Sequence, residues 1–105
     1  MPRFAKSLLL SCVLLSVAAL SACAGAPIQQ MYDARQAVRA AEKAGAAQHA
    51  PELLAEAQAH LKTATTSMHA QEYRVARDEA EIAREKAMAA RRQAEAAAPP
   101  PARQP

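Results

Sequence analysis

The feature that most constrains this chain is a long stripe of alanines near its C-terminus. Spacings of three and four residues alternate through Tyr73, Ala76, Ala80, Ala83, Ala87, Ala90 and Ala94. This alternation follows the period of an α-helix, so these side chains share one face. The stripe predicts a helix over residues 72–97, which Pro99, Pro100 and Pro101 cannot continue. Residues 98–105 are then expected to form a Pro-rich, disordered tail.

Two shorter helices are predicted upstream by the same reasoning. An apolar stripe predicts a helix over residues 28–44 and contains Ile28, Met31, Val38 and Ala41. Gly45 suits the left-handed position that commonly ends a helix. Pro51 suits the first position of a helix over residues 51–69. The stripe of that helix contains Leu54, Ala57, Leu61, Ala64 and Met68.

These segments predict an all-α fold, a small three-helix arrangement whose last two helices form an antiparallel hairpin. The alternative is one continuous helix over residues 51–97 that forms a coiled coil. Seven-residue spacing favours it and links Leu54, Leu61, Met68, Val75, Ile82 and Ala89. The companion stripe of Ala57 and Ala64 is interrupted at Gln71 and restarts in a new register at Tyr73. The interruption favours a turn between residues 69 and 72.

The first 22 residues predict a signal peptide. Arg3 and Lys6 precede a stretch of apolar or small residues from Leu8 to Leu20. A helix of that length rises about 20 Å, well short of the roughly 30 Å hydrocarbon core of a bilayer. A short apolar segment behind positive charges is typical of a signal peptide and not of a membrane-spanning helix.

Leu20, Ser21, Ala22 and Cys23 resemble the lipobox of bacterial lipoproteins. The resemblance implies that a peptidase recognises Leu20, Ser21 and Ala22, that the Cys23 thiol receives diacylglycerol, and that cleavage precedes Cys23. Residues 23–27 would then be a lipidated anchor and a short linker. Cys12 would be discarded, which leaves Cys23 without a partner for an intramolecular disulfide. The alternative is an ordinary signal cleaved after Ala24.

The charge that remains after cleavage argues against nucleic-acid binding. Removing Arg3 and Lys6 from the 13 basic residues leaves 11, against 10 acidic residues. Tyr32 and Tyr73 are the only aromatic residues left. Nucleic-acid binding depends on an excess of cations and on aromatic stacking platforms. We therefore expect contacts with a membrane and with an envelope protein or a second copy of the chain, but neither a nucleic acid nor a small-molecule substrate.

Arg35, Arg39 and Lys43 form a row at four-residue spacing and are the candidate binding residues. Such a row on one helix face is predicted to contact lipid phosphates or an acidic partner. The alternative is a solvated face. On the last helix, Arg74–Asp78 and Arg77–Glu81 are expected to form ion pairs one turn apart.

A metal site and a catalytic site are not predicted. Glu52, Glu56 and His60 form a row with His49 before it, but nothing nearby completes a tetrahedral set of ligands. Ser67 and His69 are two residues apart and would point in different directions on a helix. No catalytic residue, no metal and no cofactor beyond the lipid on Cys23 are therefore expected.

Four short runs give the chain a resemblance to a known family. They are residues 32–37 (YDARQA), 44–46 (AGA), 50–53 (APEL) and 71–76 (QEYRVA). Their order and spacing resemble the bacterial family called domain of unknown function 4398, over roughly residues 28–94. The resemblance implies an alanine-rich helical lipoprotein of the cell envelope, with no known activity. The family usually has glycine where this chain has Gln71. The hairpin also resembles a tetratricopeptide-type unit.

The expected function is that of a non-enzymatic outer-membrane lipoprotein, a helical interaction module on the periplasmic side. Ala24 follows the lipidated cysteine at a position where Asp would favour retention in the inner membrane. The alternative is a self-associating structural spacer of the envelope, built on the continuous helix.

Overall fold

The computed structural model describes residues 2–22 and 25–99, with the backbone alone for residue 2 and residues 15–22. The helices are α1 (Pro2–Ala22), α2 (Ile28–Lys43), α3 (Ala46–His49), α4 (Pro51–His69) and α5 (Tyr73–Ala97). No strand occurs among these residues, so the predicted all-α class is confirmed. The predicted tail lies outside the described residues from residue 100 onward.

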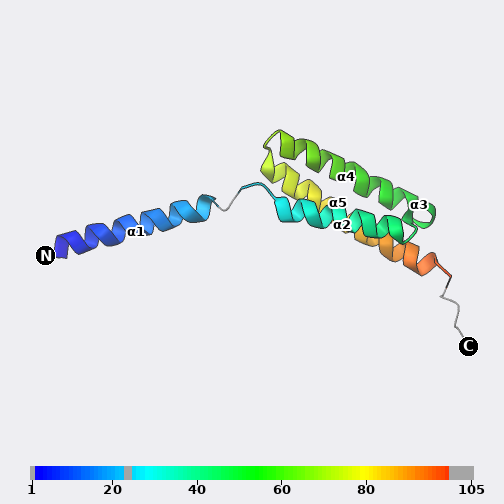
Figure 1. Ribbon diagram of the computed structural model, residues 1–105, viewed down its shortest axis with the longest axis horizontal. Helices are drawn as coiled ribbons and strands as arrows, with labels where there is room; N and C mark the ends of the chain where they lie inside the picture. Colours follow the sequence, from blue (N-terminus) through cyan, green and yellow to red (C-terminus); the bar gives the residue numbers. More distant parts are fainter. Residues whose placement is uncertain (1, 23–24, 100–105) are drawn as a thin grey trace, which may run out of the picture.

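Helices α2, α4 and α5 pack side by side as a bundle (Figure 1). Helix α4 runs antiparallel to the other two, and α2 and α5 run in the same direction (Figure 1). Helix α5 contacts both partners over most of their length. Helix α3 is a single turn in the connection between the helices predicted over residues 28–44 and 51–69, and it packs on α4 and α5.

Helix α1 covers the predicted signal peptide. Within the described residues it contacts none of the other helices. Its described apolar side chains are exposed, among them Phe4, Leu8 and Val13. None of the helices in the described ranges is long and apolar enough to span a bilayer.

The core of the bundle is built from alanine. On α5 the whole predicted stripe from Ala76 to Ala94 is buried, each alanine with no exposed surface. Ala34 and Ala41 on α2 and Ala57 and Ala64 on α4 are equally buried. The alanines that were predicted to share one helix face are therefore buried in the bundle. Because a methyl group is short, the helices approach closely where alanines face one another, and Met31, Val38 and Leu54 fill the wider places in the core.

The prediction that Ile28 belongs to the buried stripe of α2 is wrong. Ile28 is 70% exposed, whereas Met31, Ala34, Val38 and Ala41 are buried. Pro27, four residues before Met31, is buried and takes the place expected for Ile28. The buried stripe thus continues as 27, 31, 34, 38 and 41, which follows the helical period more closely than a stripe through residue 28.

The end of α2 has the predicted glycine in the left-handed conformation. Gly45 has φ 87°, and its N–H donates to the Glu42 carbonyl at 3.0 Å. A residue with a side chain is strained at such a φ, whereas glycine is not. Gly45 therefore ends α2 and allows the chain to turn into α3.

The turn between α4 and α5 is closed by two backbone hydrogen bonds. Gln71 N–H donates to the Met68 carbonyl at 3.1 Å, and Glu72 N–H donates to the Ser67 carbonyl at 2.9 Å. This pair of bonds is the Schellman pattern, with Gln71 in the left-handed position at φ 61°. The chain reverses here, so the alternative of one continuous helix over residues 51–97 is wrong for this structure.

We expect Gln71→Gly to stabilise the bundle. The left-handed backbone conformation destabilises the fold by roughly 1–2 kcal/mol when the residue has a side chain, and glycine avoids this strain. Glycine also raises the conformational entropy of the unfolded chain, which lowers the stability of the fold by about 0.4–1 kcal/mol. The net gain should be about 0.5–1 kcal/mol, measured by urea unfolding followed by circular dichroism. Gln48→Gly in helical α3 is the control and should lower stability. A loss of stability in Gln71→Gly would contradict the strained conformation.

Candidate interaction surface

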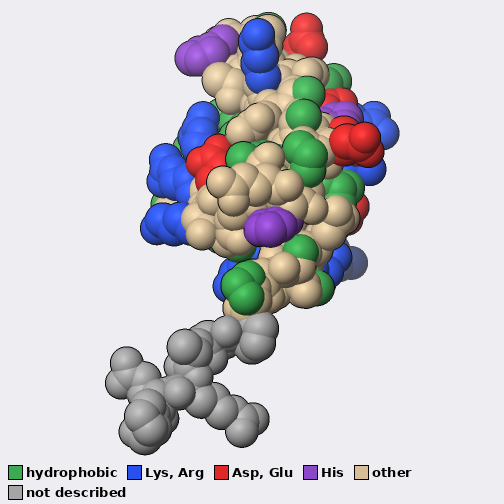
Figure 2. All heavy atoms as spheres, turned by 90° about the vertical axis from the view of Figure 1, so that its right-hand side faces the viewer, with side chains coloured by type: hydrophobic (Ala, Val, Ile, Leu, Met, Phe, Trp, Pro, Cys, Tyr) green, Lys and Arg blue, Asp and Glu red, His purple; other side chains and the backbone are tan. Residues whose placement is uncertain are grey.

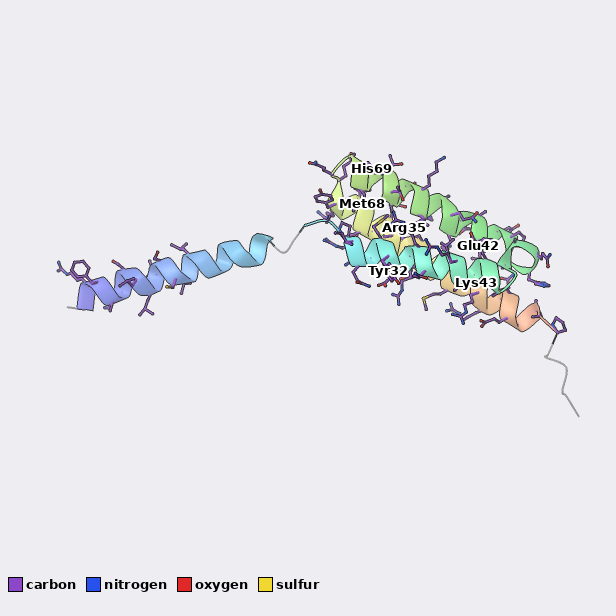
Figure 3. The ribbon with its side chains drawn as sticks, in the orientation of Figure 1. Tyr32, Arg35, Glu42, Lys43, Met68 and His69 are labelled. Carbon is purple, nitrogen blue, oxygen red and sulfur yellow. The ribbon has the colours of Figure 1, made fainter. Side chains whose placement is uncertain are left out.

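One side of α2 carries a continuous row of exposed side chains, which we call the α2 stripe: Ile28, Tyr32, Arg35, Arg39 and Lys43. Steps of three or four residues separate its members, so they follow one edge of the helix. Tyr32 and Arg35 lie in the first half of α2 and Lys43 at its end (Figure 3). Ile28 and Tyr32 are 70% and 56% exposed. The stripe is apolar at the start of the helix and basic over the rest.

The predicted row of Arg35, Arg39 and Lys43 is thus placed on one exposed surface. None of these three residues forms an ion pair within the described part of the chain. In a view along the bundle, several Lys and Arg side chains gather along one edge, and others lie at the top and on the opposite side (Figure 2). The row therefore presents cations that are not neutralised within the bundle.

The acid nearest to this row is engaged by α4. Glu42 accepts a hydrogen bond from Gln58 Nε2 at 3.1 Å, which joins α2 to α4. Lys62, one turn after Gln58 on the same edge of α4, is exposed and adds a further cation to this side.

Two side-chain pairs join α4 to α5 across the hairpin. Lys86 Nζ lies 2.8 Å from Glu56 Oε2, and His60 Nδ1 lies 2.6 Å from Glu79 Oε2. The hydrogen bond and charge of Lys86 lower the pKa of the Glu56 carboxyl. The stability that this shift contributes is present above the ordinary pKa of a glutamate and is lost as the pH falls through the lowered value. These pairs hold α4 against α5.

Two residues of the row that was considered as a metal site, Glu56 and His60, take part in these pairs. Glu56 and His60 each have a partner on α5, and Glu52 and His49 are exposed. Among the described residues no group of three or more His, Cys, Asp or Glu side chains is arranged to hold a metal ion. Ser67 is buried at 6% exposure in the α4–α5 interface.

The predicted ion pairs Arg74–Asp78 and Arg77–Glu81 are not formed in the described structure. Arg77 Nη2 instead donates to the carbonyl of Gly25 at 3.5 Å. The basic-first order of each predicted pair is the weaker one on a helix, so the guanidinium of Arg77 is available to the linker. No sequence pattern links residues 77 and 25, and this contact was not predicted.

The linker before α2 is docked on the bundle. Besides the Arg77 contact, Ile28 N–H donates to the Ala26 carbonyl at 2.9 Å and Met31 N–H donates to the Pro27 carbonyl at 3.0 Å. Pro27 is buried. The chain therefore joins the packed bundle at Pro27, and the long Arg77 contact reaches the exposed Gly25 before it. Of the predicted lipobox, Leu20, Ser21 and Ala22 lie in the backbone of α1, and Cys23 lies outside the described residues.

The fold and this surface define a small three-helix bundle with an alanine core and one basic, partly apolar face on its first helix. The family model described as domain of unknown function (DUF4398) matches residues 29–99. That match covers most of the chain, so the protein belongs to the DUF4398 family and the bundle is its family domain. No curated protein and no solved structure matches the chain.

Proposed function

We propose that this protein is a non-enzymatic lipoprotein of the outer membrane whose bundle acts as a helical interaction module on the periplasmic side. The proposal draws on the signal-peptide pattern of residues 1–22 and on the lipobox pattern that ends in Cys23. The covalent lipid on Cys23 is its only proposed prosthetic group. Two or more acyl chains suffice for stable anchoring.

The observation that carries the module is the α2 stripe. Arg35, Arg39 and Lys43 are exposed without an ion pair in the described residues, as are some cations of the hairpin, such as Arg74. The three cations of α2 differ in that they follow one another at one-turn spacing, behind the exposed Ile28 and Tyr32. A charged row that does not stabilise its own fold is suited to a contact outside it. An envelope protein or a second copy of the chain would bind the remaining faces of the bundle, including the α4–α5 hairpin. We propose that this hairpin binds its partner in the way that a tetratricopeptide unit does.

The self-associating spacer is the weaker alternative. It depends on a continuous helix over residues 51–97, whereas the chain turns back between His69 and Tyr73. The bundle is consequently much shorter than such a helix, which would rise about 70 Å.

Cys23→Ser should abolish lipidation and membrane attachment. The thiol is the group that would be alkylated, and a serine hydroxyl is a far weaker nucleophile. Radiolabelled palmitate should enter the wild-type protein and not the variant, and the variant should leave the detergent-rich phase after Triton X-114 partition. Cys12→Ser is the matched control, because that cysteine lies in the proposed signal segment, and it should behave as wild type. Palmitate on the Cys23→Ser protein would overturn the lipoprotein proposal.

A further inference from the structure

The α2 stripe carries an inference about how the bundle sits on its membrane. We infer that the stripe docks on the anionic headgroups of the bilayer that holds the anchor, so that α2 lies along the membrane surface. The inference rests on the proposed lipidation of Cys23. It names the occupant of the stripe as a lipid surface and turns the α4–α5 hairpin toward the periplasm.

The docked linker supplies the first step. Pro27 is buried, so the chain joins the bundle four residues after Cys23, and Arg77 contacts the exposed Gly25 on the way. Four residues span at most about 14 Å. The first turn of α2 therefore stays close to the headgroups. Which side of the bundle faces the lipid is then decided by its surface chemistry.

The order of side chains along the stripe matches a membrane interface. Ile28 and Tyr32, 70% and 56% exposed, come first and lie next to the anchor. An aliphatic side chain and a tyrosine are suited to the boundary between acyl chains and headgroups. Arg35, Arg39 and Lys43 follow on the same edge, where they meet phosphates as α2 lies down.

The other sides of the bundle are less suited to an anionic surface. Between α2 and α5, a shallow hollow is lined by Asp33, Glu81 and Glu85 with Arg84 among them. Between α4 and α5, Lys86 and His60 are paired with glutamates. The α2 stripe contains three cations behind two exposed apolar side chains, and the acid beside it, Glu42, is bonded to Gln58. It is therefore the side that combines a row of cations with apolar surface, as contact with an anionic bilayer requires.

The test measures orientation in the mature, lipidated protein reconstituted into vesicles. A fluorescent label is attached to Gln36→Cys, beside the stripe on α2, or to Asp78→Cys, on the side of α5 opposite its buried alanines. Vesicles contain a headgroup-nitroxide lipid with either phosphatidylglycerol and phosphatidylcholine or phosphatidylcholine alone. In the anionic vesicles the nitroxide should quench the label at position 36 several-fold more than the label at position 78. Added salt should reduce the difference.

Charge reversal provides the matched variants. Arg35→Glu/Arg39→Glu should remove the difference between the two labels. Arg74→Glu/Arg92→Glu, which makes the same change in net charge at exposed positions of α5, should leave it intact. Equal quenching at both positions in anionic vesicles would overturn the inference. The inference would also be overturned if the difference in quenching between the two labels persisted in phosphatidylcholine alone and in Arg35→Glu/Arg39→Glu. In that case the anchor by itself would set the orientation.

Failure of the proposed lipidation is distinguishable from failure of docking. Before any label is introduced, the Cys23 thiol of the mature protein should not react with a maleimide, because it would be a thioether. A reactive thiol and a protein that does not enter vesicles would overturn the lipoprotein proposal and the docking with it. A blocked thiol with equal quenching would overturn the docking alone.

Discussion

Met31→Ala should be one of the most destabilising single substitutions in this bundle. Among the described residues, Met31 is the largest side chain that is fully buried, at 2% exposure. It packs in one cluster with Ala34, Ala64, Ala80 and Ala83. The four alanines are too short to fill the space left behind, and Leu61 and Met68, which pack at the edge of the cluster, can fill only part of it. Truncation of a buried methionine costs about 2–5 kcal/mol under such conditions.

The measurement is urea unfolding of the purified protein, followed by circular dichroism. A bundle of this size has little stability to lose, since small domains bury a modest fraction of their surface. A large part of the Met31→Ala population is therefore expected to unfold well below the wild-type midpoint. Met88→Ala is the matched control, because Met88 on α5 is 39% exposed, and its cost should stay within about 0.5 kcal/mol. Equal effects of the two substitutions would contradict the burial of Met31.

Ala83→Leu should be destabilising for the opposite reason. Ala83 has no exposed surface and lies in the cluster where α2, α4 and α5 meet. Leucine adds three carbon atoms in a place where helices approach on methyl groups, so the helices must separate or the side chain must strain. Overpacking of this kind costs about 1–3 kcal/mol. The same unfolding experiment measures it.

Two further variants make the Ala83→Leu result specific. Ala59→Leu on α4 makes the same change at an exposed position and should be nearly neutral. The double variant Met31→Ala/Ala83→Leu removes volume and restores it within one cluster, so it should be more stable than the sum of the single losses predicts. Strict additivity would show that residues 31 and 83 do not share a packed core.

The positions of the helices could be predicted because their signals are local. Pro51 stands at the first position of α4, Gly45 takes the left-handed conformation after α2, and α5 ends before Pro99. The alanine stripe of α5 fixed which face of that helix is buried, because the helical period relates residues of one element to each other. The all-α class and the family followed from the same residues.

The turn between α4 and α5 lies at a position where the local sequence signal for a turn is weak. Gln71 lacks the glycine that favours a left-handed residue, and a seven-residue repeat ran through the region. The change in register of the alanine stripe at Tyr73 was the better indicator. This change in register indicates that α5 folds back so that its alanines are buried against α4. The packing of these alanines compensates for the left-handed conformation of Gln71.

Only the tertiary structure decided which side chains meet between elements. In the structure Ile28 is exposed and Pro27 is buried. Arg77 contacts Gly25, and Glu56 pairs with Lys86. Each of these contacts depends on how far a helix is rotated about its axis and shifted along its neighbour. Rotation and shift are set by the packing of all three helices together, whereas a sequence pattern describes one helix at a time. The sequence therefore determined the helices and their buried faces, and the packing determined the surface that remains for a membrane or a partner.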